Sequence, residues 1–517
     1  MHRRARIRMH PRYWTNRLAA PSSLIKPRKT KQTQGFAHWM ARVPEECERA
    51  GSELAADPVH DLRVALRRCR SMADGLMAID PDPSWKNMKR AGRDLFRSLG
   101  ELRDVQVMME WVQKLGPPED PETQGLLELL RGREHQHRLT AGDAIRAFDV
   151  RQWRKWSREL PRRAARVRPG SLVFKHLALE RWVAAHDLHR RAMRTQSQAA
   201  LHQLRIGIKR FRYIVENFLP QQHEAWSSDL KNLQDLLGDV HDLDVLWDTA
   251  VNVNAFASPE ARTRWQTIVH EAREKRVERY GERMVGPQSL WAAWREELPQ
   301  GKQIEVGAIT RLRVWASYLD PDVAHSRRVS ELAGQIFDGL GRAGLAPVST
   351  NQDLRTVLQV AATLHDVGRS KHDKNHHKAS YRMIRKMDAP LGWSSSQLQL
   401  AAVTARFHLG ALPTLRHKAL RTLALDQKKI ALHLVGILRL ANAMDSGEGM
   451  VGPLSVEVDG KGLVILIKGY NPWTRTAERI AGSAYLLELV LRRPIWIKAA
   501  PRAGIRKKTS RAARVRR

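Results

Sequence analysis

One helical pattern occurs twice in this sequence, and it restricts the fold more than any other feature. A histidine is followed by basic residues three, seven and ten positions later, first within residues 59–70 and again within residues 201–212. In a helix of 3.6 residues per turn, these spacings place all four side chains on one face. Each copy therefore predicts a helix with a row of cations along one side. The first basic ladder is His60, Arg63, Arg67 and Arg70, and the second basic ladder is His202, Arg205, Lys209 and Arg212.

An apolar stripe runs beside the second basic ladder, so one face of this helix can be buried while the ladder stays accessible. The stripe consists of Leu201, Leu204, Ile208, Phe211, Val215 and Phe218. A single basic helix is more often a solvated charged surface. The same spacing on two helices instead favours a binding surface for a linear polyanion, because successive phosphates can meet successive guanidinium groups.

The segments that follow the two ladders repeat as well. Residues 99–104 and 237–242 share the order Leu-Gly, two residues, Arg or His, and Asp. This long-period repeat predicts two related helical halves that pack together. With its twice-written helix and this partner motif, the chain resembles the CHAD domain, the conserved-histidine α-helical domain, over residues 34–300. The resemblance implies an all-helical fold with a basic central surface that binds inorganic polyphosphate through the eight residues of the two ladders.

The charge of the chain agrees with a polyanionic partner but does not choose among polyanions. The formal net charge is +35 over 517 residues. Residues 1–33 hold ten Lys or Arg and residues 501–517 hold eight, with no acidic residue in either segment, so we expect two disordered basic tails around a body that is itself basic. Nucleic acid, bound without sequence specificity, and anionic membrane therefore remain alternatives to polyphosphate.

The cysteine content predicts a protein of a reducing compartment, and the hydropathy predicts a protein without a membrane span. Cys47 and Cys69 are the only cysteines, which excludes a disulfide framework. No apolar run is long enough to span a bilayer, and the N-terminal segment lacks the apolar centre of a secretory signal. We expect a cytoplasmic location, where the protein could associate with polyphosphate granules. The sequence does not predict the oligomeric state.

A second group of residues that can carry chemistry follows a domain boundary predicted near Gly301. His365 and Asp366 come directly after an apolar helical segment, residues 358–364. Other histidines lie on neighbouring predicted helices. Imidazoles and carboxylates on separate helices are the ligands that a buried divalent metal needs. A lone histidine is more often structural, but the adjacent His365-Asp366 pair weakens that alternative.

These motifs resemble the HD superfamily, and more closely the C-terminal domain of the exopolyphosphatase and guanosine pentaphosphate phosphatase family. The matching segments are residues 364–368 (Leu-His-Asp-Val-Gly), 376–381, 405–408 and 438–441. The resemblance implies His365 and Asp366 as catalytic residues and a divalent Mn, Mg, Fe or Zn ion as cofactor. The metal ligands that it implies are His325, His365, Asp366, His376, His377, His408 and Asp445.

Two positions depart from the family pattern. Asn442 stands where the family has an acidic residue that usually completes the metal site, and Asp445, three residues later on the same helical face, is an alternative ligand. Ala379 replaces a common family histidine. The hydrolytic centre of the family also lies in an N-terminal domain of another kind, which the sequence lacks. The sequence therefore leaves three functions open. The first is a polyphosphate-binding protein with a metal-dependent phosphohydrolase domain, and the second is a non-catalytic polyphosphate-binding or scaffold protein with a degenerate HD domain. The third is a nucleic-acid-associated protein whose binding depends on the basic tails and the net charge.

The predicted architecture is mainly α. A duplicated helical bundle (residues 34–300) precedes an all-α HD domain (residues 304–452). After Pro453 the period changes to an alternation that predicts a β-hairpin within residues 454–467, followed by a helix over 477–491 and a strand over 495–498. These last elements form a small α+β cap over residues 453–500.

Overall fold

The computed structural model describes residues 35–52, 56–445, 453–460 and 462–501. The tails expected at residues 1–33 and after Pro501 lie outside the described residues. Within the described part, nineteen α-helices and one three-stranded sheet are present, which confirms the mainly α fold predicted from the sequence.

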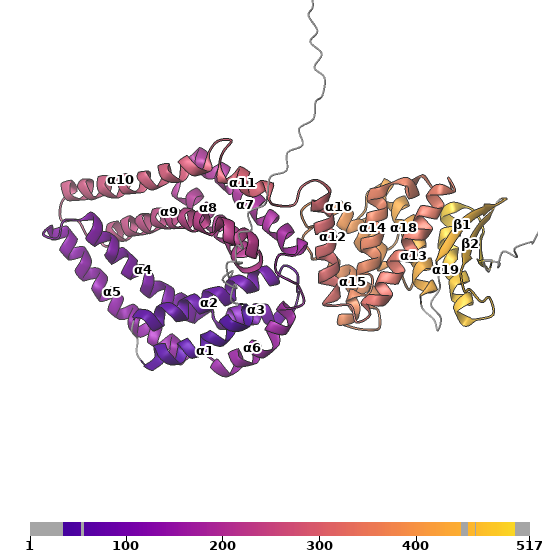
Figure 1. Ribbon diagram of the computed structural model, residues 1–517, viewed down its shortest axis with the longest axis horizontal. Coiled ribbons are helices and arrows are strands. Elements are labelled where there is room, and N and C mark those ends of the chain that lie inside the picture. Colours follow the sequence, from indigo (N-terminus) through magenta and orange to yellow (C-terminus); the bar gives the residue numbers. More distant parts are fainter. Residues whose placement is uncertain (1–34, 53–55, 446–452, 461, 502–517) are drawn as a thin grey trace, which may run out of the picture. The chain divides into compact units, whose positions relative to one another are not determined.

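The first eleven helices contain the two basic ladders (Figure 1). Their bounds are α1 (Phe36–Ser52), α2 (Ala56–Leu76), α3 (Pro83–Ala91), α4 (Arg93–Leu115), α5 (Pro121–Arg146), α6 (Val150–Ala164), α7 (Leu172–Thr195), α8 (Gln198–Phe218), α9 (Pro220–Asn252), α10 (Pro259–Met284) and α11 (Leu290–Glu296). Breaks between helices follow the Pro and Gly signals of the sequence. For example, the side chains of Asp82 and Asp120 cap α3 and α5, which both begin with proline.

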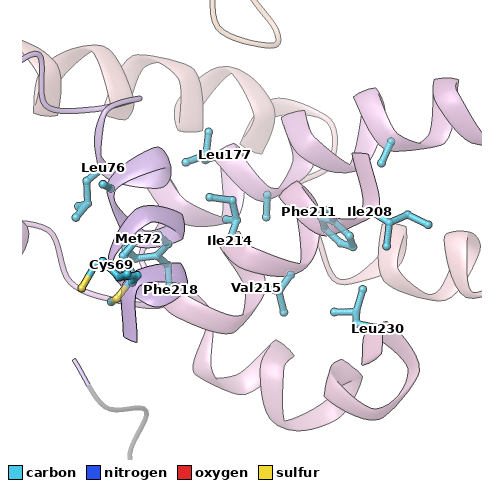
Figure 2. Packing of buried hydrophobic residues seen from close by; sticks show 14 of the residues in the cluster. Cys69, Met72, Leu76, Leu177, Ile208, Phe211, Ile214, Val215, Phe218 and Leu230 are labelled. Atoms are coloured by element: carbon cyan, nitrogen blue, oxygen red, sulfur yellow. The ribbon is translucent and has the colours of Figure 1, made fainter. Parts of the chain in front are cut away.

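The two repeated helices, α2 and α8, pack against each other through their apolar faces. Figure 2 shows Cys69 and Met72 of α2 beside Phe218 of α8. Gly75 allows this close approach, because a Cβ at this position would lie 2.4 Å from a ring carbon of Phe218. Burial of the apolar stripe therefore holds the two basic ladders on neighbouring helices.

The following helices enclose a second hydrophobic core, which includes Phe337, Leu358 and Leu438. Their bounds are α12 (Lys302–Ser317), α13 (Val323–Arg342), α14 (Gln352–Leu364), α15 (His376–Arg385), α16 (Ser395–Arg406), α17 (Lys418–Arg421) and α18 (Leu425–Met444), with 3₁₀ turns η1 (Pro347–Thr350) and η2 (Val367–Ser370). The boundary near Gly301 stays a prediction.

The C-terminal elements agree with the predicted hairpin, helix and strand. They are β1 (Leu454–Asp459), β2 (Gly462–Ile467), α19 (Arg475–Leu491) and β3 (Ile495–Ala499). The sheet order is β1-β2-β3, with β1 antiparallel and β3 parallel to β2. The central strand β2 is the most buried because it has a neighbour on each side. Among the residues that the structure describes, none of the helices combines the length and the hydropathy that crossing a bilayer requires.

Candidate functional site

Within each basic ladder, some cations already form hydrogen bonds with other residues of the protein and others do not. The guanidinium of Arg70 donates to the backbone carbonyl of Lys89 at 2.6 Å, and that of Arg212 donates to the side chain of Gln234 at 2.9 Å. Arg67 and Arg205 have no hydrogen bond or ion pair with any residue in the described part of the chain. These two guanidinium groups therefore keep their donors available for a ligand.

A pocket of about 610 Å³ lies between the two halves of the repeat. It brings together three members of the first ladder, His60, Arg63 and Arg67, and one member of the second, Arg205. Arg70, His202, Lys209 and Arg212 do not line it. The remaining charged lining residues are Asp57, Arg103, Asp104, Arg138, Asp235, Asp239 and Asp242. Arginines from separate helices thus face one concave space.

The acidic lining residues were not among the site residues predicted from the sequence. Asp104 and Asp242 occupy the same position in the two copies of the Leu-Gly motif, so the repeat itself contained the signal. The Oδ1 of Asp104 lies 3.9 Å from an Nη of Arg63. Burial raises the pKa of Asp242 to about 6, against the opposing effect of the nearby Arg205. The pocket therefore holds both the cations that attract an anion and carboxylates that repel one.

The second ladder also contains a strongly perturbed lysine and a histidine pair. Burial, together with Arg205 and other arginines of the ladders, lowers the pKa of Lys209 to about 8. The Nδ1 atoms of His202 and His241 lie 3.3 Å apart, so one of them donates to the other. Burial, with the charge of Arg205, lowers the pKa of His241 to about 4. His241 was also missed as a site residue, although it precedes Asp242 in the repeated motif.

The second site is built where four short elements end or begin. The buried residues at the end of α14 place His365 at its C-terminal cap, and Asp366 precedes the turn η2. Gly368 lets this turn approach the start of α15, because a Cβ there would lie 2.2 Å from the carbonyl oxygen of His376. His408 follows the end of α16. We call His365, Asp366, His376 and His408 the histidine centre.

The three imidazoles of the histidine centre are held in the same way. The Nδ1 of each lies near the backbone carbonyl three residues earlier: Ala362 for His365 at 2.6 Å, Asp373 for His376 at 2.8 Å and Ala405 for His408 at 2.8 Å. Nδ1 therefore carries the proton and donates it to the carbonyl, which leaves the lone pair of a neutral imidazole on Nε2. Backbone contacts of this kind orient metal-binding histidines.

The Nε2 atoms of these imidazoles converge on one carboxylate oxygen. The Oδ1 of Asp366 lies 3.1 Å from the Nε2 of His376 and 3.5 Å from those of His365 and His408. The Nε2 atoms of His376 and His408 are 3.2 Å apart. The Nε2 of His365 and the Oδ1 of Asp366 are buried without a well-oriented hydrogen-bond partner in the described part of the chain. Converging lone pairs without donors between them fit a cation.

Electrostatics agree with this reading of the histidine centre. Although burial acts to raise it, the pKa of Asp366 is held well below its usual range by His376 and the other two imidazoles. Burial lowers the pKa of both His365 and His408, so these rings stay neutral. The contact with Asp366 raises the pKa of His376, so this ring holds a proton more readily than the other two, and a bound cation would displace that proton. One carboxylate and imidazoles without a proton on Nε2 form the donor set that buried His/Asp groups need to bind a metal.

The other predicted ligands lie around this centre. Two groups of donors could hold a metal among the described residues: His325, His365 and Asp366, and Asp366, His376 and His408. Neither group contains His377 or Asp445. Asp445 instead accepts from Arg328 at 2.7 Å and lies 2.7 Å from the Nδ1 of His325.

His377 and Ala379 are both buried near the start of α15. Burial, together with Arg406, lowers the pKa of His377 to about 4. Its Nδ1 has no hydrogen-bond partner in the described part of the chain. Ala379 offers no donor atom at the position where the resembled family has histidine, so α15 contributes His376 alone to the two donor groups.

Comparisons with known proteins identify both parts of the chain. Residues 33–251 match the model of the CHAD domain, and residues 312–449 match that of the Ppx/GppA phosphatase, domain III. The comparison with curated proteins gave no match. Among solved structures, the CHAD domain from the plant Ricinus communis matches with 23% sequence identity and a TM-score of 0.34, covering 50% of this chain and 88% of that chain. The chain thus contains a CHAD domain followed by a Ppx/GppA phosphatase domain III.

Proposed function

We propose that this protein binds inorganic polyphosphate in the pocket between its basic ladders, and that the histidine centre is a metal-dependent phosphohydrolase site for polyphosphate or another phosphoanion. One observation carries the proposal: a single chain holds both a pocket with unengaged arginines and two groups of donors, each of two imidazoles and the carboxylate of Asp366, that could hold a metal. The CHAD and Ppx/GppA matches support the same class of substrate.

The pocket suits a chain of phosphates better than a single anion. Arg67 and Arg205 come from different helices, and each offers two parallel N–H donors to phosphate oxygens. Arg63 lies beside them, although Asp104 and two backbone carbonyls share its guanidinium. A ligand that reaches all three arginines must carry several negative charges.

The histidine centre fits a divalent ion held by Asp366, His376 and His408, with the Nε2 of His365 3.5 Å from the same oxygen of Asp366. Nitrogen ligands together with one carboxylate favour Mn²⁺, Fe²⁺ or Zn²⁺ over Mg²⁺, which prefers oxygen. Such an ion would supply an activated water and a Lewis acid for a phosphoryl oxygen. The protein orients the imidazoles through the three backbone carbonyls, and Arg369, 3.2 Å from Asp366, holds the other oxygen of that carboxylate.

The second candidate function is polyphosphate binding without hydrolysis. Asn442 favours it, because an amide replaces the carboxylate that the resembled family uses at this position. In that case the histidine centre stabilises the helical bundle or presents an interaction surface, and polyphosphate binding by the CHAD domain remains.

The test measures binding and hydrolysis separately on the full chain. Calorimetric titration with polyphosphate, and with double-stranded DNA at matched salt, measures the preference for phosphate chains. Phosphate release from polyphosphate with added Mn²⁺ measures hydrolysis. We expect tighter binding of polyphosphate than of DNA and Mn²⁺-dependent release. Binding without release would leave the second candidate function, and stronger binding of DNA would contradict both.

Polyphosphate affinity is expected to decrease as the pH rises above about 8, because Lys209 then loses its proton in the free protein. Because Lys209 does not line the pocket, its charge acts on a bound phosphate at a distance, and we expect affinity to fall by less than about tenfold in all over this pH range. Calorimetric titration between about pH 7.5 and 9.5 checks this. Asp242, with a pKa of about 6, titrates below that range.

Lys209→Arg is the matched control for the pH dependence. It keeps the positive charge in the second ladder, but a guanidinium stays protonated over the whole range. We expect its affinity for polyphosphate to be nearly constant with pH. An equally steep decrease in this variant would assign the titration to another group.

A further inference from the structure

His325 differs from the three imidazoles of the histidine centre in how its ring is held. It lies in the first turn of α13, where the side chain of Asp322 accepts from its backbone N–H. The Nδ1 of His325 lies 2.7 Å from Asp445, and its Nε2 lies 3.1 Å from the amide oxygen of Asn442. Both ring nitrogens are therefore engaged by residues at the end of α18.

The contact with Asn442 occupies the Nε2 of His325 in either orientation of the amide. If the amide oxygen accepts, Nε2 carries a proton and has no lone pair for a metal. If the amide nitrogen faces the ring instead, it donates to that lone pair. Among the described residues, the Nε2 atoms of His365, His376 and His408 face only one another and Asp366, with those of His376 and His408 3.2 Å apart, so no residue outside the histidine centre holds them.

The two donor groups are consequently unequal. The donor atoms of Asp366, His376 and His408 contact only one another, so this group can bind an ion without moving a residue outside it, whereas the group formed by His325, His365 and Asp366 becomes complete only when His325 leaves Asn442. Charge reinforces the difference. Asp366 is the one carboxylate in both groups, and Arg328 neutralises Asp445 on the far side of His325. Two divalent ions sharing a single carboxylate would repel each other at low dielectric.

We propose that the histidine centre binds one divalent ion, through Asp366, His376 and His408 with His365 beside them, and that Asn442 keeps a second metal position closed by holding His325. This inference rests on the proposed metal site. It assigns to Asn442 a role in metal stoichiometry, and it makes His325 a residue that lines the centre without binding the ion.

The experiment counts metal ions on the full chain. Chelator-treated protein is titrated with Mn²⁺ in a calorimeter, and bound Mn²⁺ is counted by elemental analysis after desalting. We expect one ion per chain for the wild type and two for Asn442→Asp, because the carboxylate can bind a metal while His325 turns its Nε2 toward the same ion. Electron paramagnetic resonance checks the second result, since two neighbouring Mn²⁺ ions couple magnetically and an isolated ion does not.

The outcomes separate this inference from the proposed function. Two ions in the wild type would overturn the inference and leave the metal-dependent function intact. No ion in the wild type would overturn both. One ion in both proteins, with Asn442→Asp folded by circular dichroism, would remove the role of Asn442. The wild-type count is decisive by itself if the variant fails to fold.

Discussion

Asp366→Asn is expected to abolish metal binding at the histidine centre and, with it, phosphate release, while the affinity for polyphosphate is unchanged. Asp366 belongs to both donor groups and, among the residues that the structure describes, supplies the one carboxylate that the two groups contain. Asparagine has almost the same shape, but it leaves a neutral set of donors. Loss of a residue that merely supports a ligand lowers metal affinity by up to about 100-fold, so loss of the shared carboxylate should exceed that factor. Mn²⁺ titration and phosphate release on one preparation measure both effects.

Asp373→Asn is a closely matched control for this substitution. Arg369 lies near both carboxylates, at 3.2 Å from Asp366 and 3.9 Å from Asp373. The side chain of Asp373 is 91% exposed and belongs to neither donor group, while its backbone carbonyl, which contacts His376, is kept in the variant. We expect this variant to keep both metal and hydrolysis. If Asp366→Asn lost the metal and still released phosphate from polyphosphate, the reaction would take place at another part of the molecule.

The sequence predicted the shared face of each basic ladder but not which cations are available. Helical periodicity is a local property, so it places Arg67 and Arg70 on one face equally well. The partner that engages Arg70 is a carbonyl of α3, and the partner of Arg212 is a side chain of α9. These contacts depend on how separate helices pack, and a periodic pattern contains no information about them.

The histidine centre shows the same division between local and tertiary information. The His365-Asp366 pair and His408 were found because short motifs surround them. Which of the predicted ligands direct a donor atom into the centre depends on the orientation of their rings. The backbone carbonyls of Ala362, Asp373 and Ala405 determine this orientation for the three imidazoles of the histidine centre. Asp445 was predicted as an alternative ligand from its position on the same helical face as Asn442. In the structure it contacts His325 and Arg328 and lies outside both donor groups.

Arg67→Gln together with Arg205→Gln should reduce polyphosphate affinity by about 100-fold to 10,000-fold. Both guanidinium groups line the pocket, and neither has a hydrogen bond or ion pair elsewhere in the described part of the chain. A hydrogen bond to a charged group contributes about 1.5–3 kcal/mol, so loss of one at each position costs about 3–6 kcal/mol. Glutamine keeps part of the side-chain stem and cannot pair with phosphate as a cation. Calorimetric titration with polyphosphate at fixed pH and salt measures the change.

The matched control is Arg70→Gln together with Arg212→Gln, which also removes one positive charge from each of the two ladder helices. The guanidinium groups that it removes already donate to Lys89 and Gln234. These arginines do not line the pocket, so we expect their loss to act through long-range charge alone and to reduce affinity by less than about tenfold. Comparison of the two double variants therefore distinguishes a built phosphate site from a generally basic surface. Equal losses in both, with equal losses for DNA, would mean that net charge alone drives binding, and the pocket between the ladders would then have no specific role.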